Sequence, residues 1–242
     1  MFKRLCGLIA AAFITALAPA APALAATAAA RVLFASGDVS RVRPDGGTTT
    51  LARGDEVFTG DLIQTRRGIA QLRFGDGGFV SVQHHSRFRI AEYFYGGSED
   101  GREHAIFDLL KGGIRALSGA IGHQRRERYQ MRTTVATIGI RGTAYSALFC
   151  QRDCAIDAGV NLPDGLHAKT TDGSIVLQND AGELTVPAGA AAFVADPFSI
   201  PVPSTFEPSF ARAEPASAAQ KQAADEAAEE SPPAADAETA TV

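Results

Sequence analysis

The chain has 242 residues, of which 45% are hydrophobic and 21% are charged, with 24 glycines, 12 prolines and no tryptophan. This composition fits a soluble globular domain with appendages, and it excludes a collagen-like chain, a wholly disordered chain and a polytopic membrane protein. Residues 26–203 carry equal numbers of acidic and basic side chains, so no net field draws this part of the chain to nucleic acid or to an anionic bilayer.

The first 25 residues have the pattern of an export signal. Lys3 and Arg4 precede an apolar stretch from Leu5 to Leu17, and Ala23-Leu24-Ala25 supplies the small residues that signal peptidase accepts. The apolar run is short for a membrane span of about 20 residues, so the alternative of a retained anchor is less favoured. We expect residues 1–25 to be a cleaved signal peptide, with no stable membrane span left afterwards and a periplasmic or secreted product.

Alternating apolar and polar residues dominate the stretch from Arg31 to Pro201. Short runs such as Ala70-Gln71-Leu72-Arg73-Phe74 predict half-buried strands. Each run ends in turn chemistry, and the predicted turns are Pro44–Gly47, Gly75–Gly78, Gly96–Ser98, Gly112-Gly113, Asp172-Gly173 and Asp180–Gly182. His104–Lys111 could form a short helix, although a strand is favoured. The prediction is an all-β fold: a single β-rich domain over 31–200, built as a sandwich or roll of short, mostly antiparallel strands.

Three segments of this body resemble the FecR-domain family, the extracytoplasmic module first known from transmembrane regulators of ferric-citrate uptake. They are Leu51–Thr65 with its paired Gly-Asp steps, Ala70–Val80 with an Asp-Gly turn between two strands, and Thr137–Tyr145 with the sequence Thr-Ile-Gly-Ile-Arg-Gly-Thr-Ala-Tyr. The match spans residues 36–150, and residues 155–200 are expected to form a C-terminal β-hairpin extension. The resemblance implies a β-rich, extracytoplasmic module. The regulators begin with a cytoplasmic helical segment and a membrane helix, where this chain has the expected signal peptide, so sigma-factor control is not expected to transfer. Iron specificity is not expected to transfer either, because in the regulators the transporter binds the iron complex and the module senses the transporter.

The residues of these motifs have a structural and a functional interpretation. Asp55, Asp61 and Asp76 are expected to cap their own turns by accepting backbone N–H bonds. Arg141, among isoleucines and glycines, is expected to be partly buried, with its donors spent on carbonyls or a carboxylate. The alternative is that Arg141, Gly142 and Thr143 contact a ligand or partner.

Two further clusters suggest binding. Tyr93, Phe94 and Tyr95 would serve sugar stacking if they are exposed. The stretch His123–Arg132 contains four arginines and one acid. It is interpreted as a solvated loop, and the alternative is a patch that faces an anion such as an acidic glycan, a lipid headgroup or the acidic tail of the protein itself.

Signal cleavage would leave two cysteines, Cys150 and Cys154. An even pair in an oxidising compartment predicts a disulfide, which requires the three residues between them to reverse the chain. A metal site completed by His123 or His167 is the alternative. At the other end, residues 204–242 form an acidic segment rich in Ala and Pro, which we expect to be disordered.

Catalytic motifs are absent from the sequence: there is no Gly-x-Ser-x-Gly elbow, no phosphate-binding loop and no His-Glu-x-x-His helix. We therefore expect no enzyme activity, no cofactor and no metal. The function predicted is a non-catalytic binding or sensing module that acts through a cell-envelope protein, with an exposed sheet edge as one way to receive that partner. The alternative is a structural envelope component or a carbohydrate-binding module.

Overall fold

The computed structural model describes residues 27–97, 101–124, 126–152, 154–156 and 160–205. Within them the chain forms almost only strands, which confirms the all-β prediction. The strands of the first half are β1 (Ala30–Ser36), β2 (Val39–Val42), β3 (Thr48–Thr50), β4 (Glu56–Val57), β5 (Leu62–Thr65), β6 (Ile69–Phe74), β7 (Phe79–Val82) and β8 (Arg87–Phe94). The second half contains β9 (His104–Leu117), β10 (Tyr129–Arg132), β11 (Thr137–Cys150), β12 (Ala155–Ile156), β13 (Val160–Asn161), β14 (Gly165–Asn179), β15 (Gly182–Pro187), β16 (Ala191–Val194) and β17 (Val202–Ser204). The expected signal peptide and nearly all of the expected tail lie outside the described residues.

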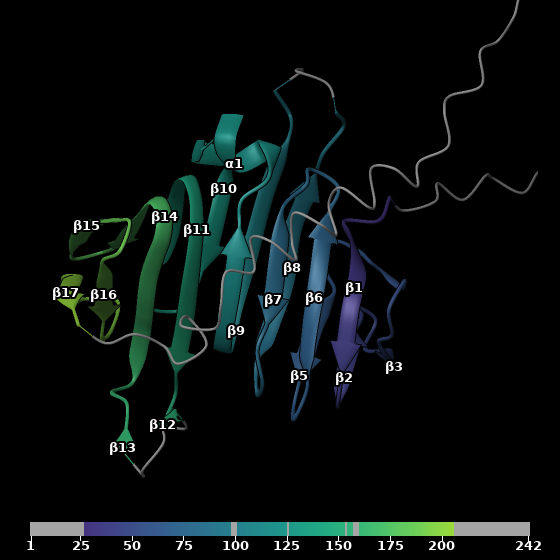
Figure 1. Ribbon diagram of the computed structural model, residues 1–242, viewed down its shortest axis with the longest axis horizontal. Coiled ribbons are helices and arrows are strands. Elements are labelled where there is room, and N and C mark those ends of the chain that lie inside the picture. Colours follow the sequence, from purple (N-terminus) through teal and green to yellow (C-terminus); the bar gives the residue numbers. More distant parts are fainter. Residues whose placement is uncertain (1–26, 98–100, 125, 153, 157–159, 206–242) are drawn as a thin grey trace, which may run out of the picture.

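All strands except β12 and β13 join one sheet (Figure 1). Its main path has the order β17-β16-β14-β11-β10-β9-β7-β6-β1-β4, with β15 paired to β14 beside it. The strands β3, β2, β5 and β8 form a second path that ends on β9. Every pairing is antiparallel except that of β9 with β10. β5 and β8 lie behind β6 and β7 in the view of Figure 1. Side chains of the two paths, including Ile63 and Phe88 from one and Leu72 and Val80 from the other, share one hydrophobic core. The sheet therefore folds over on itself and buries the apolar positions of the alternating pattern between two layers.

Two strands are much longer than predicted, because two predicted turns are not turns. Gly112-Gly113 lies inside β9, and Asp172-Gly173 lies inside β14. Gly112 has a φ of +77° and lies beside Ser86, so a side chain at this position would collide with the β7–β8 turn. The glycines bend continuous strands and do not end them. As a result β9 joins the two paths of the sheet: it pairs with β8 in its first half and with β7 in its second.

The predicted strand at His104–Lys111 is confirmed as the first half of β9, and the hairpin turn at Asp180–Gly182 joins β14 to β15. Within the stretch 155–200, β14 and β15 form an antiparallel hairpin, and β14 also pairs along its length with β11 in the main sheet. The sequence also failed to predict helix α1 (Ala120–Gln124) and the 3-10 turn at Arg126–Arg128.

The three aspartates of the family motifs hold turns as expected. Asp55 Oδ2 accepts from the N–H of Ala52 at 2.9 Å, and Asp61 Oδ2 accepts from the N–H of Phe58 at 2.9 Å. Asp76 Oδ1 accepts from the N–H of Gly78 at 3.0 Å. Asp76 also binds the first residue of α1, because its backbone carbonyl accepts a hydrogen bond from the N–H of Ala120 at 2.9 Å. This aspartate therefore connects the β6–β7 turn to the helix.

Candidate functional site

The Arg141-Gly142-Thr143 motif forms a bulge in β11, where the pairing with β14 shifts register. Thr143 is buried, and its hydroxyl donates to the Ser174 carbonyl at 2.8 Å and accepts from the N–H of Arg141 at 3.0 Å. Its own N–H donates to Ser118 Oγ at 2.9 Å. Thr143 thus connects β11 to β14 and to the residue that follows β9, which is a structural role.

Gly142 is required by the same bulge. Its φ is +60°, and a Cβ at this position would lie 3.0 Å from Nδ1 of His123 in α1. Both the left-handed backbone and the close approach of the histidine disfavour any side chain here.

The prediction that Arg141 is partly buried was wrong, because its side chain is exposed. Its neighbours Ile140 and Thr143 turn inward, whereas the bulge leaves the guanidinium on the surface. No hydrogen bond or ion pair joins that guanidinium to the described residues. Of the three residues of the motif, Arg141 is the one that a partner can reach.

Tyr93 and Tyr95 are also less accessible than a sugar platform requires. Both are half-buried and pack against the core, and the ring of Tyr93 lies 5.3 Å from that of Phe74. The Tyr93 hydroxyl accepts from the N–H of Asp76 at 2.8 Å and donates to the carboxylate of Asp76 at 3.2 Å. Burial, and then the neighbouring carboxylate of Asp76, raise the pKa of the Tyr93 phenol. Tyr93 therefore stabilises the β6–β7 turn, to which the first residue of α1 is hydrogen-bonded.

Phe94 lies on the opposite face of β8 from the two tyrosines, since successive strand residues alternate. It is partly exposed, stacks on His104 with ring centroids 6.3 Å apart, and lies 5.5 Å from the Arg102 guanidinium. The three aromatic residues thus do not form one exposed surface, and the structure does not support a glycan partner.

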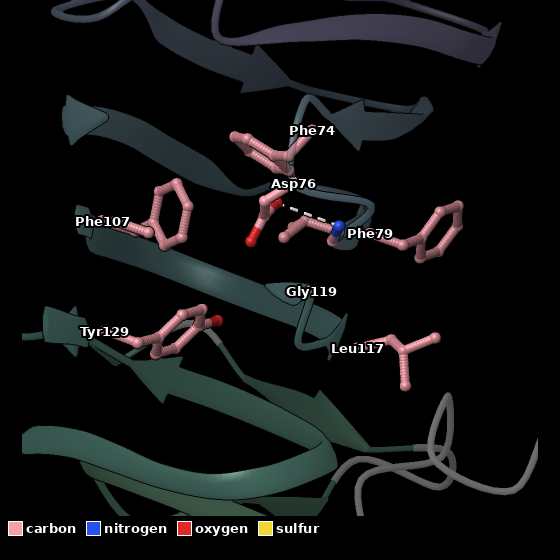
Figure 2. Close-up of a pocket in the computed structure, with 10 residues that line it drawn as sticks. Phe74, Asp76, Phe79, Phe107, Leu117, Gly119 and Tyr129 are labelled. Carbon is pink, nitrogen blue, oxygen red and sulfur yellow. Dashed lines mark hydrogen bonds between the residues drawn. The ribbon is translucent and has the colours of Figure 1, made fainter. Parts of the chain in front are cut away.

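The cavity beside Asp76 is small. Figure 2 shows Asp76 between the rings of Phe74, Phe107 and Tyr129, whereas Phe79 and Leu117 point to the other side of the sheet. Its volume of about 10 Å³ is roughly what one water molecule needs, far below the ~300 Å³ at which ligand pockets begin. Among the described residues, no three His, Cys, Asp or Glu side chains gather as a metal site.

The basic stretch His123–Arg132 is not a loop, which corrects the favoured interpretation. It contains the end of α1, the 3-10 turn and β10. Tyr129 and Met131 point into the core, and Arg132 Nε donates to Asp108 Oδ1 at 2.9 Å. Arg126 and Arg128 of the 3-10 turn are exposed, whereas Arg132 is held against Asp108.

The most exposed apolar residues lie in and before the edge strand β17, and the sequence analysis missed them. Phe198, Ile200 and Val202 are 79%, 63% and 47% exposed. We call these three side chains the apolar edge patch. Their spacing of two, with a proline on each side of Val202, was available as a signal in the sequence, but alternation alone cannot tell a buried face from an open one.

Hydrogen bonds fix the turn that carries this patch. Asp196 Oδ1 accepts from the N–H of Phe198 at 2.8 Å, and Asp196 Oδ2 accepts from the Ser199 hydroxyl at 2.5 Å. Asn179 Nδ2 donates to the carbonyls of Asp196 at 3.2 Å and of Ser199 at 2.7 Å. These bonds hold the turn that carries Phe198 against Asn179 at the end of β14. A partner that covers Phe198 would therefore cost the turn little conformational entropy.

The predicted disulfide joins Cys150 to Cys154, with Cα atoms 5.4 Å apart. It lies at the end of β11 and reverses the chain there, as the spacing required. Nearby, the N–H of Arg152 donates to Asp164 Oδ1. The alternative of a metal site is not supported, since both sulfurs are in the bridge.

Comparisons with known proteins agree with the resemblance. The family model described as FecR protein matches residues 61–161, which extend from β5 to β13 and include the second and third motifs. The chain therefore contains a FecR region. A comparison with curated protein sequences finds no match.

Two crystal structures of a candidate anti-sigma factor from Parabacteroides distasonis are similar to this chain at 12% sequence identity, with TM-scores of 0.44 and 0.43. The similarity covers 59% and 58% of this chain, and 58% and 57% of the chains in those structures. The chain thus spans less than two thirds of either one. Within the described part of the chain, no helix has the length and apolar character needed to cross a membrane.

Proposed function

We propose that the protein is an exported, non-catalytic FecR-like module that binds or senses a protein of the cell envelope. The FecR match supports the class of module. The Cys150–Cys154 bridge supports an oxidising compartment, because structural disulfides persist outside the cytoplasm. The export pattern of residues 1–25 points the same way.

The observation that carries the proposal is the apolar edge patch. Large apolar side chains held outward together on a fixed turn are typical of protein-binding surfaces. Pro201 and Pro203 lack the N–H that an added strand would use, so the partner is expected to pack on side chains and not to extend the sheet at β17. Exposed Arg141 is a second, separate contact in this proposal.

A site-specific crosslink in living cells tests the proposal. A photoreactive amino acid in place of Ile200 should capture one envelope protein, whereas the same residue in place of exposed Arg87 on β8 should not. Phe198→Asp should abolish the capture, because it places a charge in an interface that must exclude water.

Three results would contradict the proposal. Equal capture at positions 87 and 200 would show that the patch is not selective. Capture of a second copy of the chain would indicate self-assembly of a structural component. Turnover of a small molecule by the purified protein, abolished by one substitution, would replace a binding role with catalysis.

A further inference from the structure

One row of side chains crosses eight neighbouring strands on the face of the sheet that points away from the core. Directly paired residues define it, from Ser204 through Ala191, Lys169, Ser146, Arg115, Ser81 and Gln71 to Phe34. Around the four central members, Ser146, Arg115, Ser81 and Gln71, the residues on either side, such as Tyr145 and Ala147, belong to the core. We call this set the outer row.

The outer row has a small-residue centre and positive charge. Ala191, Ser146 and Ser81 have short side chains and are only 9%, 1% and 7% exposed, while Lys169 and Arg115 stand between them and supply two cations. Apolar pairs flank the row on the same face: Phe79 opposite Leu117 on one side, and His167 opposite Phe193 on the other. An extended segment with apolar and acidic side chains would match this surface.

The chain leaves the sheet at the end of this row, because β17 ends at Ser204, which pairs with Ala191. The residues that follow read Thr-Phe-Glu-Pro-Ser-Phe, and residues 206–242 contain eight acids and two bases. Phe206 and Phe210 are the only aromatic residues beyond Ser204. The chain's own C-terminal segment thus begins beside the row and has the complementary charge and apolar content.

The distances along the outer row predict which residues of the C-terminal segment would lie opposite which residues of the row. Adjacent strands lie about 4.8 Å apart, so Lys169 on β14 is about 10 Å from the end of β17. Three extended residues cover about the same distance, which brings Glu207 level with Lys169. Phe210, three residues further on, would come level with Arg115 on β9, beside Leu117.

We propose that residues 206–214 fold back across the outer row, with Glu207 paired to Lys169 and with Phe206 and Phe210 packed on the flanking apolar side chains. The segment then covers the outer face of the sheet and competes with any other molecule for it. This inference does not depend on the envelope partner, which the proposed function places at the apolar edge patch.

The absence of tryptophan makes a direct test possible. In the full chain, Phe210→Trp gives a single indole at the expected contact, and Ala234→Trp gives one far along the acidic segment. The Phe210→Trp emission should be blue-shifted, and its quenching by neutral acrylamide should be several-fold weaker than that of Ala234→Trp.

Charge exchange tests the register. Lys169→Glu in the Phe210→Trp chain should raise quenching to the level of Ala234→Trp, and adding Glu207→Lys should restore the protection. Glu207→Lys alone should also release the segment, and this variant leaves the sheet unchanged. Arg87→Glu on β8 makes the same change of charge on the other path of the sheet and should have no effect.

The outcomes that overturn the inference are equally direct. Equal quenching of the two tryptophans would show that the segment does not dock. Protection that survives both Lys169→Glu and Glu207→Lys, or that is lost with Arg87→Glu, would place the contact elsewhere. Protection that grows with protein concentration would assign the surface to a second copy of the chain.

Discussion

The hydroxyls of Tyr129 on β10 and Tyr145 on β11 lie 3.0 Å apart within the hydrophobic core. Both rings are buried, and burial raises the pKa of both phenols. Tyr145 is the last residue of the family motif Thr137–Tyr145. The motif therefore contributes one hydroxyl of a buried polar pair as well as the bulge at Arg141–Thr143.

A double-mutant cycle should reveal this pair. Tyr145→Phe leaves the Tyr129 hydroxyl buried without a partner and should cost about 1–3 kcal/mol of unfolding free energy. Tyr129→Phe should cost a similar amount, but the double variant should cost clearly less than the sum, because no orphaned hydroxyl remains. Urea denaturation measures all four values. Simple additivity would mean that the two hydroxyls do not interact.

The Arg-Gly-Thr motif should separate into structural and surface residues. Thr143→Val removes the hydroxyl bonds to Ser174 and Arg141 and should cost about 1–3 kcal/mol, whereas Arg141→Ala should change stability by less than about 0.5 kcal/mol. Thermal denaturation of the two variants makes the comparison.

A matched pair of glycine variants completes this comparison. Gly142→Ala and Gly54→Ala both place a side chain at positive φ, but only Gly142 has a neighbour, His123, within 4 Å. Gly142→Ala should therefore be the more destabilising. Equal losses would show that the contact with His123 contributes nothing.

His167 should make the protein sensitive to mild acid. It is buried, its Nε2 donates to the Pro163 carbonyl at 3.0 Å, and its ring packs at a tilt against that of Phe193, with centroids 4.6 Å apart. Burial lowers the pKa of its imidazole below 6.5, an effect that the bond to Pro163 opposes. The unfolded chain then binds a proton more readily than the folded chain, so stability is complete above about pH 6.5 and falls as the pH drops below it.

Melting temperatures at pH 7.5 and 5.5 measure this dependence. The decrease on acidification should be smaller in His167→Gln, whose side chain does not titrate in this range. An identical decrease in both proteins would assign the acid sensitivity to other groups.

The bridge between Cys150 and Cys154 should add modest stability because it closes a short loop. The loop-entropy relation gives about 2 kcal/mol for a ring of this size. The variant with Cys150→Ser and Cys154→Ser should lose about this amount in denaturant unfolding. Added reductant should destabilise the unaltered chain by a similar amount and leave the variant unchanged.

Local rules predicted the strands and turns whose signals are unambiguous. The alternation of Ala70, Leu72 and Phe74 and the Asp76 turn that follows were predicted correctly, since burial on one face and an aspartate cap are local properties. Gly112 and Gly173 were misassigned because glycine serves a bulge and a turn equally well. Only the partner strands decide between them.

The sequence could not predict which side chains from different strands contact one another and which stay exposed. The accessibility of Tyr93 depends on Phe74 and Asp76 from another hairpin, and that of Arg141 depends on the bulge beside it. The apolar edge patch was hidden because its residues have the same spacing as buried ones. The contact of β8 with the β6–β7 hairpin sets the first of these outcomes and the pairing of β11 with β14 sets the second, and both are non-local properties.

The pairings of β6 with β1 and of β11 with β14 have a consequence for expressing parts of this protein. A fragment cut at residues 61 and 161 would lose β1 and β14, the neighbours of β6 and β11. Two long backbone edges, rich in β-branched and aromatic residues, would then be open to other chains. We therefore expect the region that the family model matches to aggregate when it is expressed alone, unless residues 30–36 and 165–179 are included.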